Sequence, residues 1–155
     1  MNTLDKSVWR ILMVGFLIAI LSGICMSVQG VFNTQVTKQS GMWVTNVFVQ
    51  GTAMLVCFLV WATFDKTSFS GLLKVEPKYM LLGGAIGAVI TYTVVKSMES
   101  LGPAKAVMFI VIAQLIAAYL IELFGLFGVE KQPFEFRKAI GMAIAIIGIV
   151  IFKWK

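Results

Sequence analysis

The 155 residues carry a net charge of +6, 59% of them are hydrophobic, and the mean hydropathy is +0.94. This composition excludes an ordinary soluble domain and indicates a polytopic membrane protein with no separate extramembrane domain. The positive charge does not indicate nucleic-acid binding. The basic residues lie mainly at the ends of apolar stretches and in loops, where they orient helices against anionic lipid.

Five apolar stretches fill most of the chain and predict an all-α bundle of five transmembrane helices, a single domain over residues 1–155. The first four exceed the roughly 18 residues that cross a bilayer core. The last has 14 uncharged residues and reaches a spanning length only if its flanking basic side chains extend to the headgroups. The expected spans are Val8–Gln35, Met42–Phe64, Tyr79–Ser97, Ala106–Phe127 and Ala139–Phe152.

An odd number of spans places the two termini on opposite sides of the membrane. Eight basic residues fall on the side of the N-terminus and five on the other side. The positive-inside rule then favours a cytoplasmic N-terminus, although so small a difference leaves insertion in both orientations open. The eight are Lys6, Arg10, Lys66, Lys74, Lys78, Lys131, Arg137 and Lys138, and the five are Lys38, Lys96, Lys105, Lys153 and Lys155.

Amide side chains interrupt the first two predicted spans. Gln29 and Asn33 are four residues apart and share a helix face, and Asn46 and Gln50 repeat that spacing. Because the two helices are expected to be antiparallel neighbours, both pairs lie toward one side of the membrane, together with Tyr92 of the third span. The amides either hydrogen-bond to one another and hold the bundle together, or line a water-accessible cavity. Their clustering on one side favours the cavity.

The fourth predicted span places Gln114, Ala118 and Glu122 on one helix face. The small Ala118 leaves room beside that face, and Glu122 is expected about two turns from the far end of the span. An acidic residue inside a membrane is by default a candidate functional site, where a proton or a cation competes for the carboxylate. The alternative is a structural acid at the membrane surface.

Small residues mark the third and fifth spans, at Gly83–Ala88 and at Gly141, Ala145 and Gly148. Faces of this kind let helix backbones approach closely, since helix association in lipid depends on van der Waals packing. The close approach occurs either within one bundle or between subunits.

Enzymatic and metal chemistry have few residues available. The chain has no histidine, and its two cysteines, Cys25 and Cys57, lie inside apolar spans without a CxxC pair. Zinc and haem therefore lack ligands, and histidine-based catalysis lacks its essential residue. Both thiols are interpreted as small packed side chains. We expect neither an enzyme nor a cofactor.

Several segments resemble one known family. These are Gln29–Asn33 in the first span, Gln114-Leu115 and Ile121–Gly128 around the fourth, and the short basic last span after Pro133-Phe134. Together they resemble the YdcZ-like proteins of the drug/metabolite transporter superfamily. That family usually has Gly-Gln where this chain has Ala-Gln at 113–114, and often Asp-His at 122–123. Here the acid remains without the imidazole, which argues against a proton relay of two groups.

The resemblance implies a five-helix half of a ten-helix transporter that is built from two inverted repeats. Such a half needs a partner of opposite orientation, as an antiparallel homodimer or a paired heterodimer in the bacterial inner membrane. The function expected is secondary transport of a small molecule by alternating access. The alternative is a non-transporting scaffold or accessory subunit. The expected pathway residues are Gln29, Asn33, Asn46, Gln50, Tyr92, Gln114 and Glu122.

Overall fold

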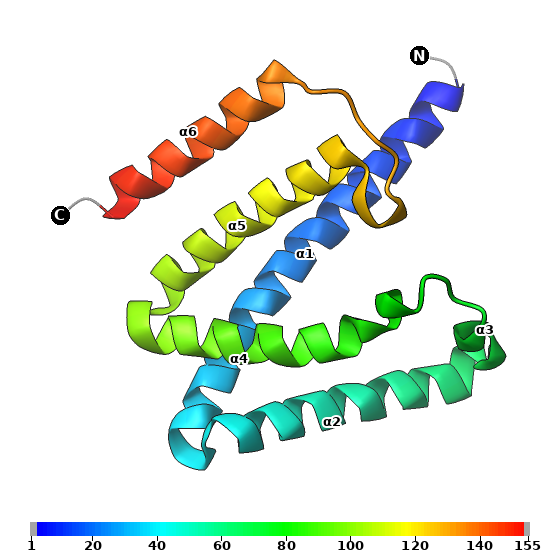
Figure 1. The fold of residues 1–155 in the computed structure, drawn as a ribbon, viewed down its shortest axis with the longest axis vertical. Helices are drawn as coiled ribbons and strands as arrows, with labels where there is room; N and C mark the ends of the chain where they lie inside the picture. Colours follow the sequence, from blue (N-terminus) through cyan, green and yellow to red (C-terminus); the bar gives the residue numbers. More distant parts are fainter. Residues whose placement is uncertain (1–2, 154–155) are drawn as a thin grey trace. The chain divides into compact units, whose positions relative to one another are not determined.

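The computed structural model describes residues 3–153, and the side chains of residues 8–152. Within that part the chain is helical and has no strand, which confirms the all-α prediction (Figure 1). It divides into two compact units, residues 1–96 and 97–155. The α-helices are α1 (Thr3–Ser40), α2 (Met42–Val60), α3 (Ser70–Leu73), α4 (Gly83–Leu101), α5 (Pro103–Phe124) and α6 (Phe136–Lys153). A π-helical segment (Trp61–Asp65) and two 3-10 segments (Lys78–Leu82 and Leu126–Gly128) complete the elements.

Four helical stretches among the described residues are long and apolar enough to cross a membrane: Val8–Ser40, Met42–Asp65, Lys78–Leu101 and Pro103–Phe124. Four of the five expected spans are therefore confirmed in kind. The helix α6 is not in this group, because its 18 residues include three basic side chains. The fifth span stays a prediction.

Glycines decide where two of the spanning helices end. The first helix runs on to Ser40, beyond the predicted end, and stops where Gly41 takes a φ of 87°. The fourth was predicted to continue to Phe127, and this was wrong. It ends at Phe124 because Gly125 adopts the left-handed conformation, with a φ of 65°. Glycine enters that region without a steric penalty and commonly terminates helices in this way.

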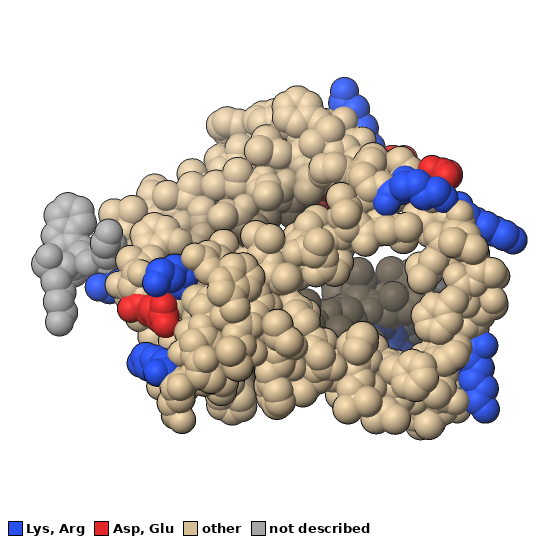
Figure 2. Space-filling model, turned by 60° about the horizontal axis from the view of Figure 1, so that its bottom comes forward, with Lys and Arg blue, Asp and Glu red and all other residues tan. Residues whose placement is uncertain are grey.

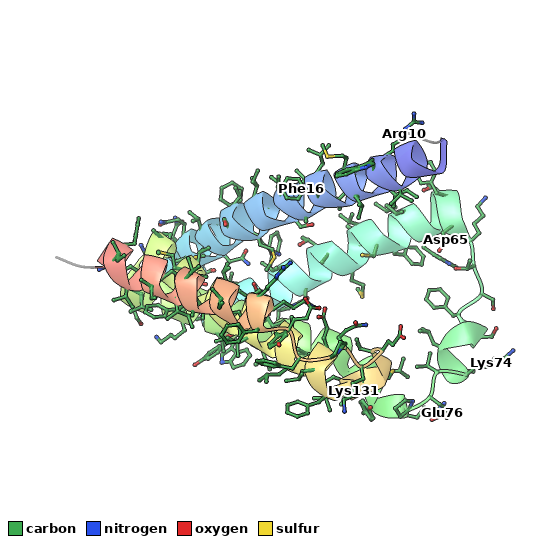
Figure 3. The ribbon with its side chains drawn as sticks, turned by 90° about the horizontal axis from the view of Figure 1, so that it is seen from above. Arg10, Phe16, Asp65, Lys74, Glu76 and Lys131 are labelled. Carbon is green, nitrogen blue, oxygen red and sulfur yellow. The ribbon has the colours of Figure 1, made fainter. Side chains whose placement is uncertain are left out.

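The first unit contains the α1–α2 hairpin and the part of α4 that contacts α2. Its buried side chains are largely polar, since Asn33, Thr34, Thr37, Thr45 and Asn46 are all buried. Figure 3 shows Arg10 of α1 and Asp65 of the π-helical segment at the open end of the hairpin, away from the turn at Gly41. Charged residues thus mark the hairpin end and leave the lengths of the helices apolar.

The helices expose most of their large apolar side chains. Along α1, for example, Ile11, Phe16 and Leu21 are each more than half exposed. The surface seen in Figure 2 is almost wholly uncharged, with lysine, arginine and acidic side chains in a few small groups. In water such a surface would drive association, whereas in a bilayer lipid tails or a partner helix cover it.

The second unit pairs α5 with α6 through a folded-back loop. The carbonyl of Glu122 accepts hydrogen bonds from the N–H groups of Gly125, at 3.3 Å, and Gln132, at 2.9 Å. The N–H of Glu135 donates to the hydroxyl of Tyr119 at 3.3 Å. The loop therefore closes onto the last turn of α5 and brings the first turn of α6 beside Glu122.

Candidate functional site

A pocket of about 440 Å³ lies between α5 and α6. Its volume falls within the range of about 300–1,000 Å³ that is typical of small-molecule sites. The lining residues follow helical spacing on both sides, so that one face of each helix contributes. They are Leu115, Ala118, Tyr119 and Glu122 from α5, and Lys138, Gly141 and Met142 from α6. The walls are mainly apolar, and the charges lie at one end.

The charged end has two carboxylates for one ammonium group. The Nζ of Lys138 lies 3.6 Å from Oε2 of Glu122 and 3.2 Å from Oε1 of Glu135. Lys138 lies just before the uncharged stretch 139–152. Its hydrogen bond to Glu135 raises the pKa of Lys138 above its ordinary value, and the charges of Glu135 and Glu122 raise it further. Lys138 is therefore protonated at neutral pH, and the three groups together carry one excess negative charge.

Glu122 lies in the last turn of α5, not about two turns from the end of the helix as predicted. The difference follows from the early termination of α5 at Phe124. Its side chain is 46% exposed and paired with Lys138. This position suits an acid near the membrane surface, and the pocket beside it gives that acid a place to meet a ligand. The small Ala118 lines the pocket, as its position beside Glu122 predicted.

Three of the predicted pathway residues come together where α2 contacts α4. Asn46 donates from Nδ2 to the carbonyl of Ala88 at 2.9 Å. Gln50 donates from Nε2 to Oγ1 of Thr91 at 3.3 Å. The ring of Tyr92 stacks on that of Trp43, with centroids 5.5 Å apart. Both amides therefore hydrogen-bond to α4.

The remaining predicted pathway residues differ in exposure. Asn33 is 8% exposed, whereas Gln29 and Gln114 are exposed. Two further polar atoms, Oγ1 of Thr37 and Oδ1 of Asn46, are buried and have no hydrogen-bond partner among the described residues. A buried carbonyl without a donor is destabilising, so the Asn46 oxygen is a notable feature of this unit.

Sequence reasoning missed Glu135 and Lys138 as site residues. The sequence patterns predict Lys138 as a basic residue that flanks the last span and bears on membrane orientation, and they indicate no role for Glu135. Their separation of three residues at the start of a helix was the available signal, because such a pair lies on one helix face. Their approach to Glu122 depends on the loop conformation, for which the sequence gives no simple pattern.

A second pocket, of about 420 Å³, lies in the first unit and is lined by apolar and aromatic residues near the end of α2. The rings of Trp61 and Phe69 pack there at a tilt of 54°, with centroids 4.7 Å apart, and the Trp61 ring N–H donates to the Thr67 carbonyl at 2.8 Å. Cys57 lines this pocket. Among the described residues, no group of three or more histidine, cysteine, aspartate or glutamate side chains could hold a metal ion.

The described residues are helical, and several of their helices are long and apolar enough to cross a membrane, which are the features of a helical membrane protein. Comparison with known protein families identifies the family to which the chain belongs. Residues 14–151 match the family described as "Putative inner membrane exporter, YdcZ". The chain belongs to this family, which confirms the resemblance, and it is an inner-membrane protein of an exporter family rather than of an enzyme family. No curated protein and no solved structure matches significantly.

Proposed function

We propose that this chain is a subunit of a dimeric secondary transporter that exports a small organic molecule across the bacterial inner membrane by alternating access. The observation that carries the proposal is the pocket between α5 and α6, with the carboxylate of Glu122 at its charged end. Membership of an inner membrane exporter family supports it.

The charged end of the pocket adjoins a basic segment. Lys131, Arg137 and Lys138 all belong to the loop and first turn that follow α5. The positive-inside rule favours a cytoplasmic location for this segment. In that orientation the pocket opens near the cytoplasmic surface, which is where an exporter takes up its substrate.

We propose a dimer because five spans would leave one chain without a second repeat. With α6 as the fifth span, one chain has no inverted repeat with which to alternate. A second copy of opposite orientation, or a paired homologous subunit, supplies it. The exposed apolar side chains of the helices offer surface for such a partner.

The polar residues of the first unit complete the proposed pathway. Asn46, Gln50 and Tyr92 join α2 to α4 through two hydrogen bonds and one ring contact, each of which can break and re-form as helices move. Three further amides, Gln29, Asn33 and Gln114, are proposed to line the route.

Substitution of Glu122 tests the proposal. Cells that produce the protein are exposed to a panel of toxic organic compounds, and efflux is measured for those to which they become tolerant. We expect Glu122→Gln to abolish efflux while the protein still folds and inserts. The matched control is Glu130→Gln, because Glu130 is an exposed acid of the loop between α5 and α6. This substitution should leave efflux unchanged. Normal efflux by Glu122→Gln would remove this residue from the mechanism.

A non-transporting scaffold is the second candidate, and the hydrogen bonds from Asn46 and Gln50 to α4 favour it, because they hold helices together. A scaffold predicts that Gln114→Leu changes the stability of the oligomer. It also predicts that no compound in the panel is moved by either the parent protein or the variant.

A further inference from the structure

We infer that the pocket between α5 and α6 binds an organic monocation with an apolar body, which takes the carboxylate of Glu122 from Lys138 while Lys138 remains paired with Glu135. This inference rests on the proposed export function and names the substrate class of the same pocket. In this inference Lys138 releases Glu122 to the ligand, and Glu135 keeps Lys138 paired.

The arrangement of charges favours a cation. Two carboxylates share one ammonium, so Glu122, Glu135 and Lys138 together carry one excess negative charge. Lys138 lies nearer to Glu135, at 3.2 Å, than to Glu122, at 3.6 Å. The closer pair joins Lys138 to the residue that immediately precedes α6, whereas the longer contact joins two helices. A ligand cation can therefore replace the longer contact without leaving Lys138 unpaired.

The walls of the pocket suit an apolar body. Leu115, Ala118 and Met142 offer aliphatic and thioether surface. The ring of Tyr119 also lines the pocket, and its hydroxyl is held by the N–H of Glu135. Cations are attracted to aromatic ring faces, so this ring adds a second attraction for the same charge.

Other ligands fit the pocket less well. An anion would have to draw Lys138 away from both carboxylates, and it would meet the excess negative charge. A divalent metal ion requires several oxygen ligands, whereas the residues that line the pocket supply one carboxylate, a phenol and hydrocarbon. The phosphate of a lipid headgroup would need Lys138 in the same way as any other anion.

Purified protein in detergent micelles tests the inference with two probes of the same shape and opposite charge. Tetraphenylphosphonium and tetraphenylborate are measured by equilibrium dialysis, and binding to protein-free micelles is subtracted. We expect specific binding of the cation and at least about tenfold weaker binding of the anion, a difference of about 1.4 kcal/mol or more.

Four variants locate the site. Glu122→Gln should weaken cation binding at least about tenfold, and Lys138→Gln should strengthen it about threefold because the competing ammonium is removed. Gly141 lines the pocket and an added Cβ there meets nothing within 4 Å, so Gly141→Leu should occupy the pocket and abolish binding. The control Glu130→Gln should bind as the parent protein does. If Glu122→Gln does not fold, the opposite effects of Lys138→Gln and Gly141→Leu still decide the question.

Two results would overturn the inference: cation binding that none of these substitutions changes, or anion binding that is tighter and is lost in Lys138→Gln. The second result would indicate a site for an anionic group such as a lipid phosphate. Flux in vesicles separates this inference from the proposed function. Cation binding without flux supports the ligand class and contradicts transport, whereas flux without cation binding contradicts the ligand class alone.

Discussion

Replacement of Asn46 by leucine tests whether the amide of Asn46 belongs to the transport pathway or only stabilises the fold. The side chain is 3% exposed, and its Nδ2 donates to the carbonyl of Ala88 at 2.9 Å. Its Oδ1 is buried without a partner among the described residues. Leucine branches at Cγ as asparagine does and removes both polar atoms together, but it is the larger side chain, so overpacking of the buried site is expected to cost about 1 kcal/mol or more.

The magnitudes limit the size of the expected stability change. Interhelical hydrogen bonds in membranes contribute about 0.6 kcal/mol on average, with a maximum of about 1.7 kcal/mol. A buried polar atom without a partner destabilises by about 1–3 kcal/mol. Loss of the hydrogen bond, relief of the unpaired atom and overpacking of about 1 kcal/mol together predict that the free energy of unfolding of Asn46→Leu lies between about 2 kcal/mol below and about 1 kcal/mol above that of the parent protein.

Reversible unfolding in mixed detergent micelles, followed by far-ultraviolet circular dichroism, measures this change. Gln50→Leu is the matched comparison, because Gln50 is only half-buried and loses its bond to Thr91 without relieving a buried oxygen. It should lower stability by about 0.6 kcal/mol. A pathway role for Asn46 predicts a stable variant without efflux. Loss of more than about 2 kcal/mol with normal efflux would refute this reasoning and make Asn46 a structural amide.

Two further changes test the end of α5. Gly125→Ala forces a Cβ into the left-handed region, with Lys131 Cβ only 3.1 Å away, and should lower stability by at least about 1–2 kcal/mol. Gly148→Ala, in open space within a helix, should raise stability by up to about 1 kcal/mol. Equal effects of the two substitutions in the same unfolding assay would contradict the left-handed conformation of Gly125. Tyr119→Phe removes the acceptor of the Glu135 N–H and should speed hydrogen exchange of that amide, as measured by mass spectrometry, while unchanged exchange would show that the bond does not hold the loop.

Much of the architecture could be predicted because hydropathy and length determine spanning helices. The end of α5 could not, since Leu126 and Phe127 continue the apolar run and hydropathy does not register backbone conformation. The positive φ at Gly125 ends the helix, and Gly125 was an available signal for this. The early end moved Glu122 from the predicted interior of the span to its last turn.

The site was predictable where it depends on one helix and not where it depends on two. Helical spacing placed Ala118 beside Glu122, and both line the pocket. The partner of Asn46 is a main-chain carbonyl 42 residues away, to which no side-chain pattern points. Lys138 reaches Glu122 only through the conformation of the loop between α5 and α6, so sequence alone left it as a charge for orientation.

Counting labels on single chains tests whether the protein is half of an inverted-repeat transporter. Cys25 and Cys57 are replaced by alanine, one cysteine is added at each end of the chain, and intact cells are treated with a thiol reagent that does not cross the membrane. Intact-mass spectrometry then counts labels per chain. Five spans, with α6 crossing the membrane, predict one label on every chain, whichever way it is inserted. Chains with two labels or none would show an even number of spans and contradict the half-transporter account.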